Sequence, residues 1–167
     1  HNYLKKFLTM LNKKSEPLLI IQARYNSSRL PGKIFLKLSG FEIWYLLYKR
    51  LSLKFDNIVF AIPENITNDL LYQKLKNKKI KVFRGSENNV VLRFINTLEH
   101  FKSKHFIRVC ADNPYTCHKE ISRLVKVYSK NSLDYCYNNS PYGNYYPDGF
   151  GAEISSLKIL KKIYHQT

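Results

Sequence analysis

Short apolar runs alternate along the chain with segments in which apolar residues recur at helical spacing. The apolar runs predict strands at 18–21, 57–62, 80–83, 105–110 and 133–137. The helical spacing predicts helices at 41–53, 68–75 (with Thr67 or Asn68 as N-cap), 90–101 and 120–129, and one that begins near Ser155. Strands that alternate with helices in this way are typical of βαβ units. The sequence therefore predicts an α/β fold with a mostly parallel central sheet flanked by helices.

The carboxyl ends of the predicted strands are where a ligand is expected, because open α/β sheets bind ligands at this edge. The loops concerned follow Ile21, Ile62, Phe83, Val109 and Tyr137. Side chains that could bind a substrate should therefore gather in these loops.

The loop after the first predicted strand is strongly basic. Residues 20–33 read IIQARYNSSRLPGK, in which Arg24, Arg29 and Lys33 lie close together and a Pro-Gly pair forces a turn. Arginine binds phosphate through two parallel hydrogen bonds and lysine acts as a point charge, so the loop is a candidate polyphosphate site. It is not a P-loop, because Ile34 follows the lysine where Ser or Thr is needed. From the residues alone, a solvated basic loop is the alternative.

The pattern QARxxSxRLPGK resembles the signature loop of the CMP-sugar cytidylyltransferases, which include Kdo and acylneuraminate transferases and, most similar here, the spore-coat polysaccharide type. The resemblance implies that the loop grips the triphosphate of CTP through Arg24, Arg29 and Lys33. The backbone around Gln22 and Ala23 would lie near the base and ribose. The nucleotide-binding residues implied for this loop are Gln22, Ala23, Arg24, Ser28, Arg29 and Lys33.

A second stretch, VFRGSENNVVLRF at 82–94, resembles the family pattern V-F-R-G-S-E-D-D-V-L-D-R-Y, which lies beside the nucleotide. The resemblance implies nucleotide contacts for Arg84, Gly85, Ser86 and Arg93. A cation on a helix surface is the alternative for Arg93. Three acids of the pattern are replaced, which could strengthen anion binding, alter the substrate or mark lost activity. The replacements are Asn88, Asn89 and Leu92.

A third stretch, IRVCADNP at 107–114, resembles the strand-end pattern R-x-T-G-D-x-P and implies that Asp112 is a ligand of a catalytic Mg²⁺. A carboxylate suits this role, because Mg²⁺ takes one or two protein carboxylates together with substrate phosphates. A turn residue is the alternative for Asp112. Cys110 and Ala111 replace the usual Thr-Gly, and Cys110 is expected to be a small buried residue rather than a nucleophile.

A fourth stretch, YYPDGFGAEI at 145–154, resembles Y-P-D-G-L-D-V-E-V on the sugar side of the family's site. The resemblance implies that Asp148 and Glu153 contact sugar hydroxyls. A turn acid or a surface acid is the alternative for each. Gly151 replaces the second acid of the pattern.

Together these stretches extend the resemblance over residues 17–160. It implies a Rossmann-like nucleotide-diphospho-sugar transferase fold, CTP and a sugar acceptor as substrates, Mg²⁺ as cofactor and a homodimer. Arg24, Lys33 and Asp112 would be catalytic. Family members continue further, often with a D-T-x-x-D segment that supplies another metal carboxylate. We therefore expect residues 17–167 to be a nucleotide-binding domain truncated at its C-terminus, after an N-terminal extension or tag-adjacent segment at 1–16.

The composition keeps other functions open. A net charge of +16, with 13 Tyr and 10 Phe, would suit a nucleic-acid-binding domain, but no recognised motif of that kind is present and we do not expect nucleic acid as a partner. A homologue that binds without turnover, or one that uses another NTP or acceptor, is a further alternative. Three cysteines without short paired spacings favour a cytoplasmic protein without disulfides or zinc. No apolar run approaches the roughly 20 residues of a membrane span.

Overall fold

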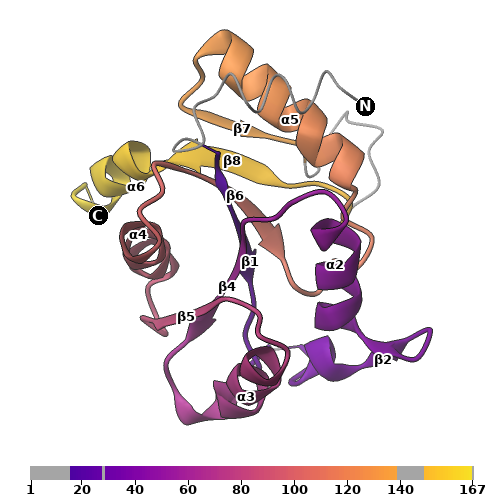
Figure 1. The fold of residues 1–167 in the computed structure, drawn as a ribbon. Coiled ribbons are helices and arrows are strands. Elements are labelled where there is room, and N and C mark those ends of the chain that lie inside the picture. The colour runs from indigo at the N-terminus through magenta and orange to yellow at the C-terminus, as the bar shows by residue number, and fades with distance from the viewer. Residues whose placement is uncertain (1–15, 28, 139–148, 167) are drawn as a thin grey trace.

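A six-stranded sheet forms the centre of the fold (Figure 1). The computed structural model describes residues 16–27, 29–138 and 149–166. The strand order is β5-β4-β1-β6-β8-β7. The strands are β1 (Leu18–Gln22), β4 (Ile58–Pro63), β5 (Val82–Gly85), β6 (His105–Cys110), β7 (Tyr135–Tyr137) and β8 (Glu153–Ser156). Only β8, among the described strands of this sheet, runs against the others, so the predicted α/β fold with a mostly parallel sheet is confirmed.

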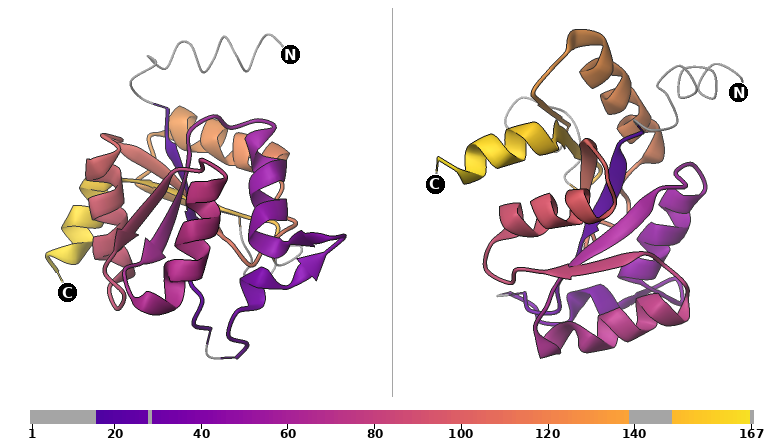
Figure 2. Two further views of the ribbon diagram at one scale, coloured as in Figure 1. Left: turned by 60° about the horizontal axis from the view of Figure 1, so that its bottom comes forward. Right: turned by 60° about the vertical axis from the view of Figure 1, so that its left-hand side comes forward.

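Helices cover both faces of the sheet (Figures 1 and 2). One face carries α2 (Ile43–Ser52), α3 (Asp69–Asn77) and α5 (His118–Asn131), whose apolar residues join the larger core cluster. The other face carries α4 (Val90–His100) and α6 (Leu157–Tyr164), which pack on a second cluster. The remaining described elements are short: η1 (Lys33–Phe35), η2 (Ile66–Asn68) and a hairpin of β2 (Lys37–Leu38) and β3 (Phe41–Glu42).

The central strand β1 shows why the sheet is buried on both faces. Leu19 and Ile21 belong to the cluster under α2, α3 and α5, whereas Leu18 and Ile20 belong to the cluster under α4. All four residues are at most 1% exposed. A continuous apolar run is typical of parallel strands that are covered by helices on both sides. Gln22 ends the run, so polar groups begin at the carboxyl edge of the sheet.

The structure differs from the sequence prediction near the C-terminus. The strand β8 was not predicted, because its sequence EISS offers a single buried apolar side chain, Ile154. Antiparallel pairing with both β6 and β7 forms it instead. The helix expected from near Ser155 begins at Leu157, after the Ser156 hydroxyl accepts a hydrogen bond from the Ile159 N–H at 3.3 Å.

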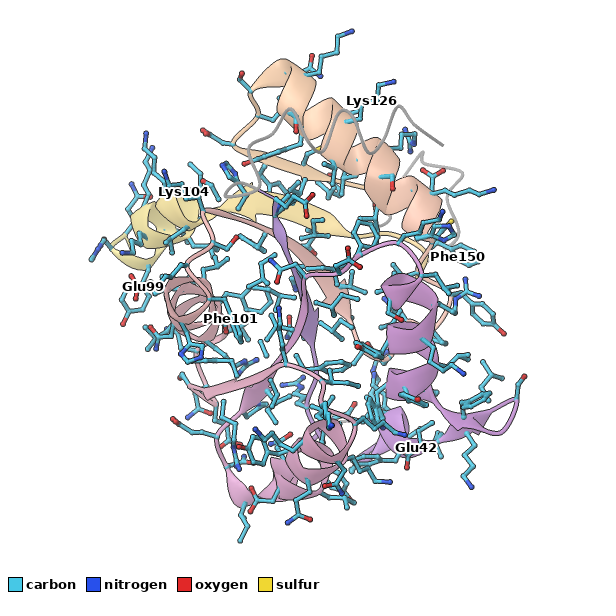
Figure 3. The ribbon with its side chains drawn as sticks, viewed as in Figure 1. Glu42, Glu99, Phe101, Lys104, Lys126 and Phe150 are labelled. Carbon is cyan, nitrogen blue, oxygen red and sulfur yellow. The ribbon has the colours of Figure 1, made fainter. Side chains whose placement is uncertain are left out.

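Part of the positive charge lies on the outer surface. The exposed residues Lys104 and Lys126 lie at the periphery of the molecule (Figure 3). Lys161 on α6 pairs with Glu99 on α4 at 2.6 Å, with about half of each side chain exposed. These lysines are part of a solvated surface, as is usual for this residue type. Within the described part of the chain, no helix has the length and apolar character needed to cross a membrane.

Candidate active site

The carboxyl edge of the sheet brings together two charged residues that lie far apart in the sequence. Lys33 begins η1 in the loop after β1, and Asp112 follows β6. Their side chains form an ion pair in which the Lys33 side chain is 29% exposed and that of Asp112 31%. The two loops meet because β1 and β6 are parallel neighbours. A cation suited to phosphate and a carboxylate suited to a metal ion are therefore in contact at an accessible position.

A left-handed glycine closes the first loop. Gly32 has a φ of 71°, a backbone conformation that is favourable only without a Cβ. Its N–H donates to the carbonyl of Tyr25 at 2.9 Å, and a Cβ on Gly32 would lie 3.2 Å from the Tyr25 ring. The Tyr25 ring also lies near Phe35, with the ring centroids 6.0 Å apart. The Pro-Gly turn thus folds the loop back on itself and places Lys33 at its end.

A buried asparagine, Asn68, anchors the start of this loop. Asn68 is 0% exposed, and its Oδ1 accepts a hydrogen bond from the Tyr25 N–H at 2.9 Å. Its Nδ2 donates to Asn65 Oδ1 at 2.6 Å. Asn68 occupies the N-cap position of α3, as one of the two predicted candidates, but its side chain makes no capping hydrogen bond. The Asn68 amide instead holds the basic loop, a contact that sequence reasoning missed.

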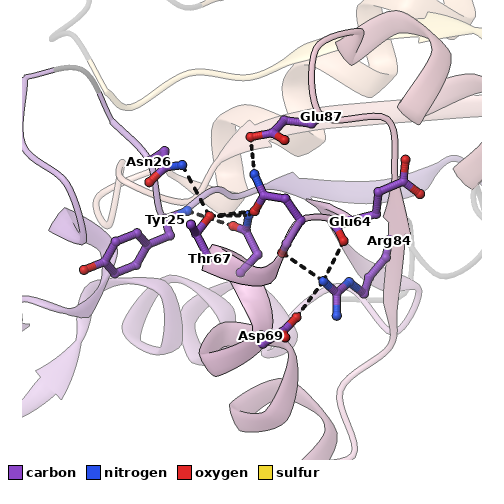
Figure 4. A network of polar contacts seen from close by, with 9 residues as sticks. Tyr25, Asn26, Glu64, Thr67, Asp69, Arg84 and Glu87 are labelled. Atoms are coloured by element: carbon purple, nitrogen blue, oxygen red, sulfur yellow. Dashed lines mark hydrogen bonds and ion pairs between the residues drawn. The ribbon is translucent and has the colours of Figure 1, made fainter.

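Arg84 ties β5 to the start of α3. Its guanidinium donates to the carbonyls of Glu64 and Asn65, each at 2.9 Å, and pairs with Asp69 at 2.7 Å. Figure 4 shows these contacts converging on the guanidinium group. The guanidinium also lies over the Tyr72 ring, 5.2 Å from its centroid. These contacts give Arg84 a structural explanation, and its nucleotide contact stays a prediction.

Arg93 lies in the interior of the fold rather than on a helix surface, so the surface alternative for this residue is wrong. It is 1% exposed and donates to the carbonyls of Ser86 and Glu87. Burial, followed by the nearby charge of Arg24, lowers the pKa of Arg93. No described carboxylate forms an ion pair with it, and its Nε has no hydrogen-bond partner there. A positive potential therefore builds up beside the basic loop.

Gly85 and Asn89 complete the surroundings of Arg93. A Cβ on the buried Gly85 would lie 2.9 Å from the Phe83 ring and 3.2 Å from Arg93 Cγ, so a larger residue does not fit. Asn89 caps α4, since its Oδ1 accepts a hydrogen bond from the Leu92 N–H at 2.8 Å. Asn and Asp are comparably good N-caps, so the replacement of the family's acid at this position keeps the helix start.

A second polar group surrounds Arg108, to which the sequence analysis gave no role. Its Nε donates to Gln22 Oε1 at 2.8 Å, and its Nη1 donates to Glu153 Oε1 at 2.6 Å. Its Nη2 lies 3.8 Å from the sulfur of Cys110. Burial alone would lower the pKa of Arg108, but Cys110 and Glu153 raise it overall. Burial raises the pKa of the Cys110 thiol, which argues against a nucleophilic thiolate, as expected.

The other predicted loop residues differ in exposure. Arg24 and Arg29 are exposed, whereas Ala23 is 2% exposed and packs in the core. Ser86 is half-buried, and its hydroxyl accepts a hydrogen bond from the Asn89 N–H at 3.2 Å. Ser28 and Asp148 lie outside the described residues.

The described residues contain no cluster of three His, Cys, Asp or Glu side chains that could hold a metal ion by themselves. Asp112 offers a single carboxylate at the edge of the sheet. This donor set fits Mg²⁺ bound mainly through substrate phosphates, which is how the ion is commonly held at nucleotide sites.

A cavity of about 380 Å³ lies at the opposite, amino edge of the sheet. Its lining includes Pro17 before β1 and His105 at the start of β6. It is therefore separate from the cluster of charged loops. The polar and charged character of the carboxyl edge, rather than this cavity, identifies the candidate active site.

Comparison with known sequences finds a matching family model and a related protein. A family model described as cytidylyltransferase matches residues 18–146. The spore coat polysaccharide biosynthesis protein SpsF of Bacillus subtilis is 33% identical over 133 residues, which cover 75% of this chain and 55% of SpsF. This chain thus spans about half the length of that relative.

Solved structures also match. A cytidylyltransferase from Leptospira borgpetersenii has a TM-score of 0.83 and 26% identity, covering 92% of this chain and 65% of that one. CMP:2-keto-3-deoxy-manno-octonic acid synthetase, in a structure with CTP, has a TM-score of 0.70 and 14% identity. The match covers 92% of this chain and 79% of the synthetase chain. The second match concerns the fold alone, and it confirms the expected nucleotide-diphospho-sugar transferase fold. Because the family model spans the basic loop, the Arg93 segment and Asp112, this chain belongs to the cytidylyltransferase family.

Proposed function

We propose that this chain forms the nucleotide-binding part of an enzyme that transfers CMP from CTP to a sugar and releases pyrophosphate. The contact between Lys33 and Asp112 carries the proposal, because it joins a phosphate-binding cation to a metal-binding carboxylate at the edge where such sheets bind ligands. The acceptor is a nonulosonic, Kdo-like or related surface-polysaccharide sugar. The names of SpsF and of the CMP:2-keto-3-deoxy-manno-octonic acid synthetase support this class.

The reaction is a displacement at phosphorus. A sugar hydroxyl oxygen bonds to the α-phosphorus of CTP, the bond from that phosphorus to the oxygen bridging the β-phosphate breaks, and the hydroxyl proton passes to solvent. Such chemistry depends on positioning and charge neutralisation more than on covalent help from the protein. Arg24, Arg29 and Lys33 neutralise the charge that develops on pyrophosphate. The buried Arg93 adds positive potential beside them.

Asp112 is the residue proposed to hold Mg²⁺. A bound Mg²⁺ would supply Lewis-acid chemistry, neutralising phosphate charge and favouring deprotonation of the attacking hydroxyl. The charges of the Lys33–Asp112 pair match the two parts of a magnesium nucleotide: the ammonium group suits a phosphate and the carboxylate suits the metal. A homodimer belongs to the same proposal, and light scattering of the protein would test it.

Calorimetric titration with CTP, UTP, GTP and ATP, with and without Mg²⁺, tests the nucleotide. We expect selective binding of CTP that Mg²⁺ strengthens. Pyrophosphate release with a panel of acidic sugars then tests turnover. CTP binding without pyrophosphate release, also in a longer form of the protein, would favour a homologue that binds without turnover. Weak, equal and salt-sensitive binding of all four nucleotides would favour a general polyanion surface.

A further inference from the structure

A polar surface lies at the carboxyl-edge end of the sheet face that α4 and α6 cover. This surface, called the polar ledge below, consists of Gln22, Arg108, Cys110, Tyr135, Tyr137 and Glu153. Strand register places these side chains on one face, because Gln22 pairs with Cys110, and Glu153 pairs with both Arg108 and Tyr137. Ile20 and Phe106 lie on the same face but are buried under α4. The face thus changes from apolar to polar at Gln22 and Arg108.

Arg108 fixes the orientation of the Gln22 amide. A guanidinium group only donates hydrogen bonds, so the Gln22 atom 2.8 Å from Arg108 Nε must be the amide oxygen. The amide nitrogen then points away from Arg108 with two donors. No described residue accepts a hydrogen bond from that nitrogen, and it is not among the buried atoms that lack a partner. Gln22, which is half-buried, therefore offers an oriented amide nitrogen whose N–H groups contact no described acceptor.

We propose that Arg108 is a positioning residue that turns the Gln22 amide nitrogen toward an oxygen of the acceptor sugar. This inference rests on the proposed function and gives the Gln22 side chain a role toward the acceptor, whereas the family resemblance placed only the backbone around Gln22 near the nucleotide. The backbone of Gln22 keeps its expected place beside the nucleotide.

The position of the polar ledge in the sheet separates it from the predicted nucleotide contacts. The strand order is β5-β4-β1-β6-β8-β7, so β5 lies on one side of β1. The segment from Arg84 to Arg93 starts in β5 and continues into α4. The polar ledge begins at Gln22 on β1 and extends over β6, β8 and β7 on the other side. Cys110 links it to the phosphate-binding residues, since its sulfur lies 3.8 Å from Arg108 Nη2 and Asp112, two residues further along the chain, pairs with Lys33. An acceptor on the ledge would therefore lie next to the reacting phosphate.

The chemistry of the polar ledge suits a sugar. Gln22 supplies donors, Glu153 supplies carboxylate oxygens, and Tyr135 and Tyr137 present rings that are 49% and 47% exposed. Burial, followed by the charge and hydrogen bond of Glu153, raises the pKa of Tyr135 to about 12, so its hydroxyl stays protonated at neutral pH. Arg108 does not serve as a free anion site, because Glu153 neutralises it at 2.6 Å. Donors and acceptors side by side match a ligand that is rich in hydroxyl groups.

The first test is Gln22→Met, which keeps the length of the side chain and removes the amide. The matched control is Gln73→Met at an exposed position of α3. With saturating CTP and Mg²⁺ and 2-keto-3-deoxy-manno-octonate as the acceptor probe, we expect Gln22→Met to raise the acceptor KM by about 10-fold. The CTP Kd from calorimetry should change less than about two-fold, and Gln73→Met should change neither value.

Three outcomes would overturn the proposal. Equal effects of Gln22→Met and Gln73→Met on the acceptor KM would show that the Gln22 amide has no specific role. If Gln22→Met weakened CTP binding by the same factor as it raised the acceptor KM, the Gln22 side chain would contact the nucleotide instead. Wild-type protein that binds CTP but is not saturated by the sugar acid would count against the polar ledge as its site. Absence of selective CTP binding in the wild type would instead contradict the proposed function itself.

The second test asks whether Arg108 acts through Gln22. Arg108→Lys keeps a cation opposite Glu153 but lacks the fork that reaches Gln22 as well. We expect this variant to raise the acceptor KM in the wild type and to have no further effect in the Gln22→Met background. Independent, multiplicative effects of the two substitutions would show that Arg108 does not act by positioning Gln22.

Discussion

The two edges of the central sheet hold their polar groups in different ways. At the amino edge, His105 Nδ1 lies 3.1 Å from the Tyr128 hydroxyl, and the Ser103 hydroxyl donates to the His105 carbonyl at 2.8 Å. At the carboxyl edge, Arg93 is buried beside another cation, Arg24, and no described carboxylate pairs with it. The polar groups named at the amino edge satisfy one another, whereas the carboxyl edge includes Arg93, whose positive charge no described carboxylate compensates. The difference supports the proposal that the carboxyl edge binds an anionic ligand.

The largest expected effect is the loss of turnover when the Lys33–Asp112 pair is broken. Lys33→Ala should lower turnover about 100- to 1,000-fold, equivalent to about 3–4 kcal/mol, because it removes a positive charge from the developing pyrophosphate. Lys126→Ala, at an exposed position of α5, is the control for the loss of one lysine. Steady-state pyrophosphate release measures both. Equal activity of the two variants would show that Lys33 has no specific role in the reaction.

A pair of arginine substitutions sharpens the contrast between compensated and uncompensated charge. Arg24→Met should weaken CTP binding about 10-fold without loss of stability, because it also relieves repulsion of Arg93. Arg84→Met should lower the free energy of unfolding by about 1–2 kcal/mol, because it breaks the contacts with Asp69 and two carbonyls. Calorimetry and urea denaturation of both variants separate the two effects. If Arg84→Met weakened CTP binding as strongly as Arg24→Met, Arg84 would also be a nucleotide contact.

The sequence predicts much of this architecture for identifiable reasons. The apolar run of β1 indicates a buried strand, and parallel strands force the loops that hold Lys33 and Asp112 to the same edge. Arg108 was missed because its partner Glu153 lies on β8, whose sequence carries no strand pattern. The Asn68 contact with Tyr25 joins residues 43 positions apart, and nothing in the local sequence distinguishes it from a helix cap.

A smaller effect concerns the start of α4, next to the uncompensated charge. Asn89→Ala should lower the free energy of unfolding by about 1 kcal/mol, because it removes the capping bond to Leu92. Asn89→Asp, which restores the acid of the family pattern, should keep the cap and interact favourably with the helix dipole. Urea denaturation measures both variants. A loss of stability in Asn89→Asp equal to that in Asn89→Ala would contradict the capping role.

The smallest expected effect lies at the amino edge, where His105 makes stability depend on pH. Burial, followed by the charge of Lys104, lowers the pKa of His105 in the folded protein. The unfolded chain therefore takes up this proton more readily, and the free energy of unfolding should fall as the pH drops below about 6.5, the ordinary value for histidine. His105→Gln removes the titrating group while it retains an amide that can reach the Tyr128 hydroxyl.

Urea denaturation of His105→Gln between about pH 7 and pH 5 should show a shallower loss of stability than the wild type. His165→Gln, at an exposed position after α6, is the matched control and should follow the wild-type curve. Parallel curves for His105→Gln and the wild type would show that the half-buried imidazole of His105 does not control the loss of stability at low pH.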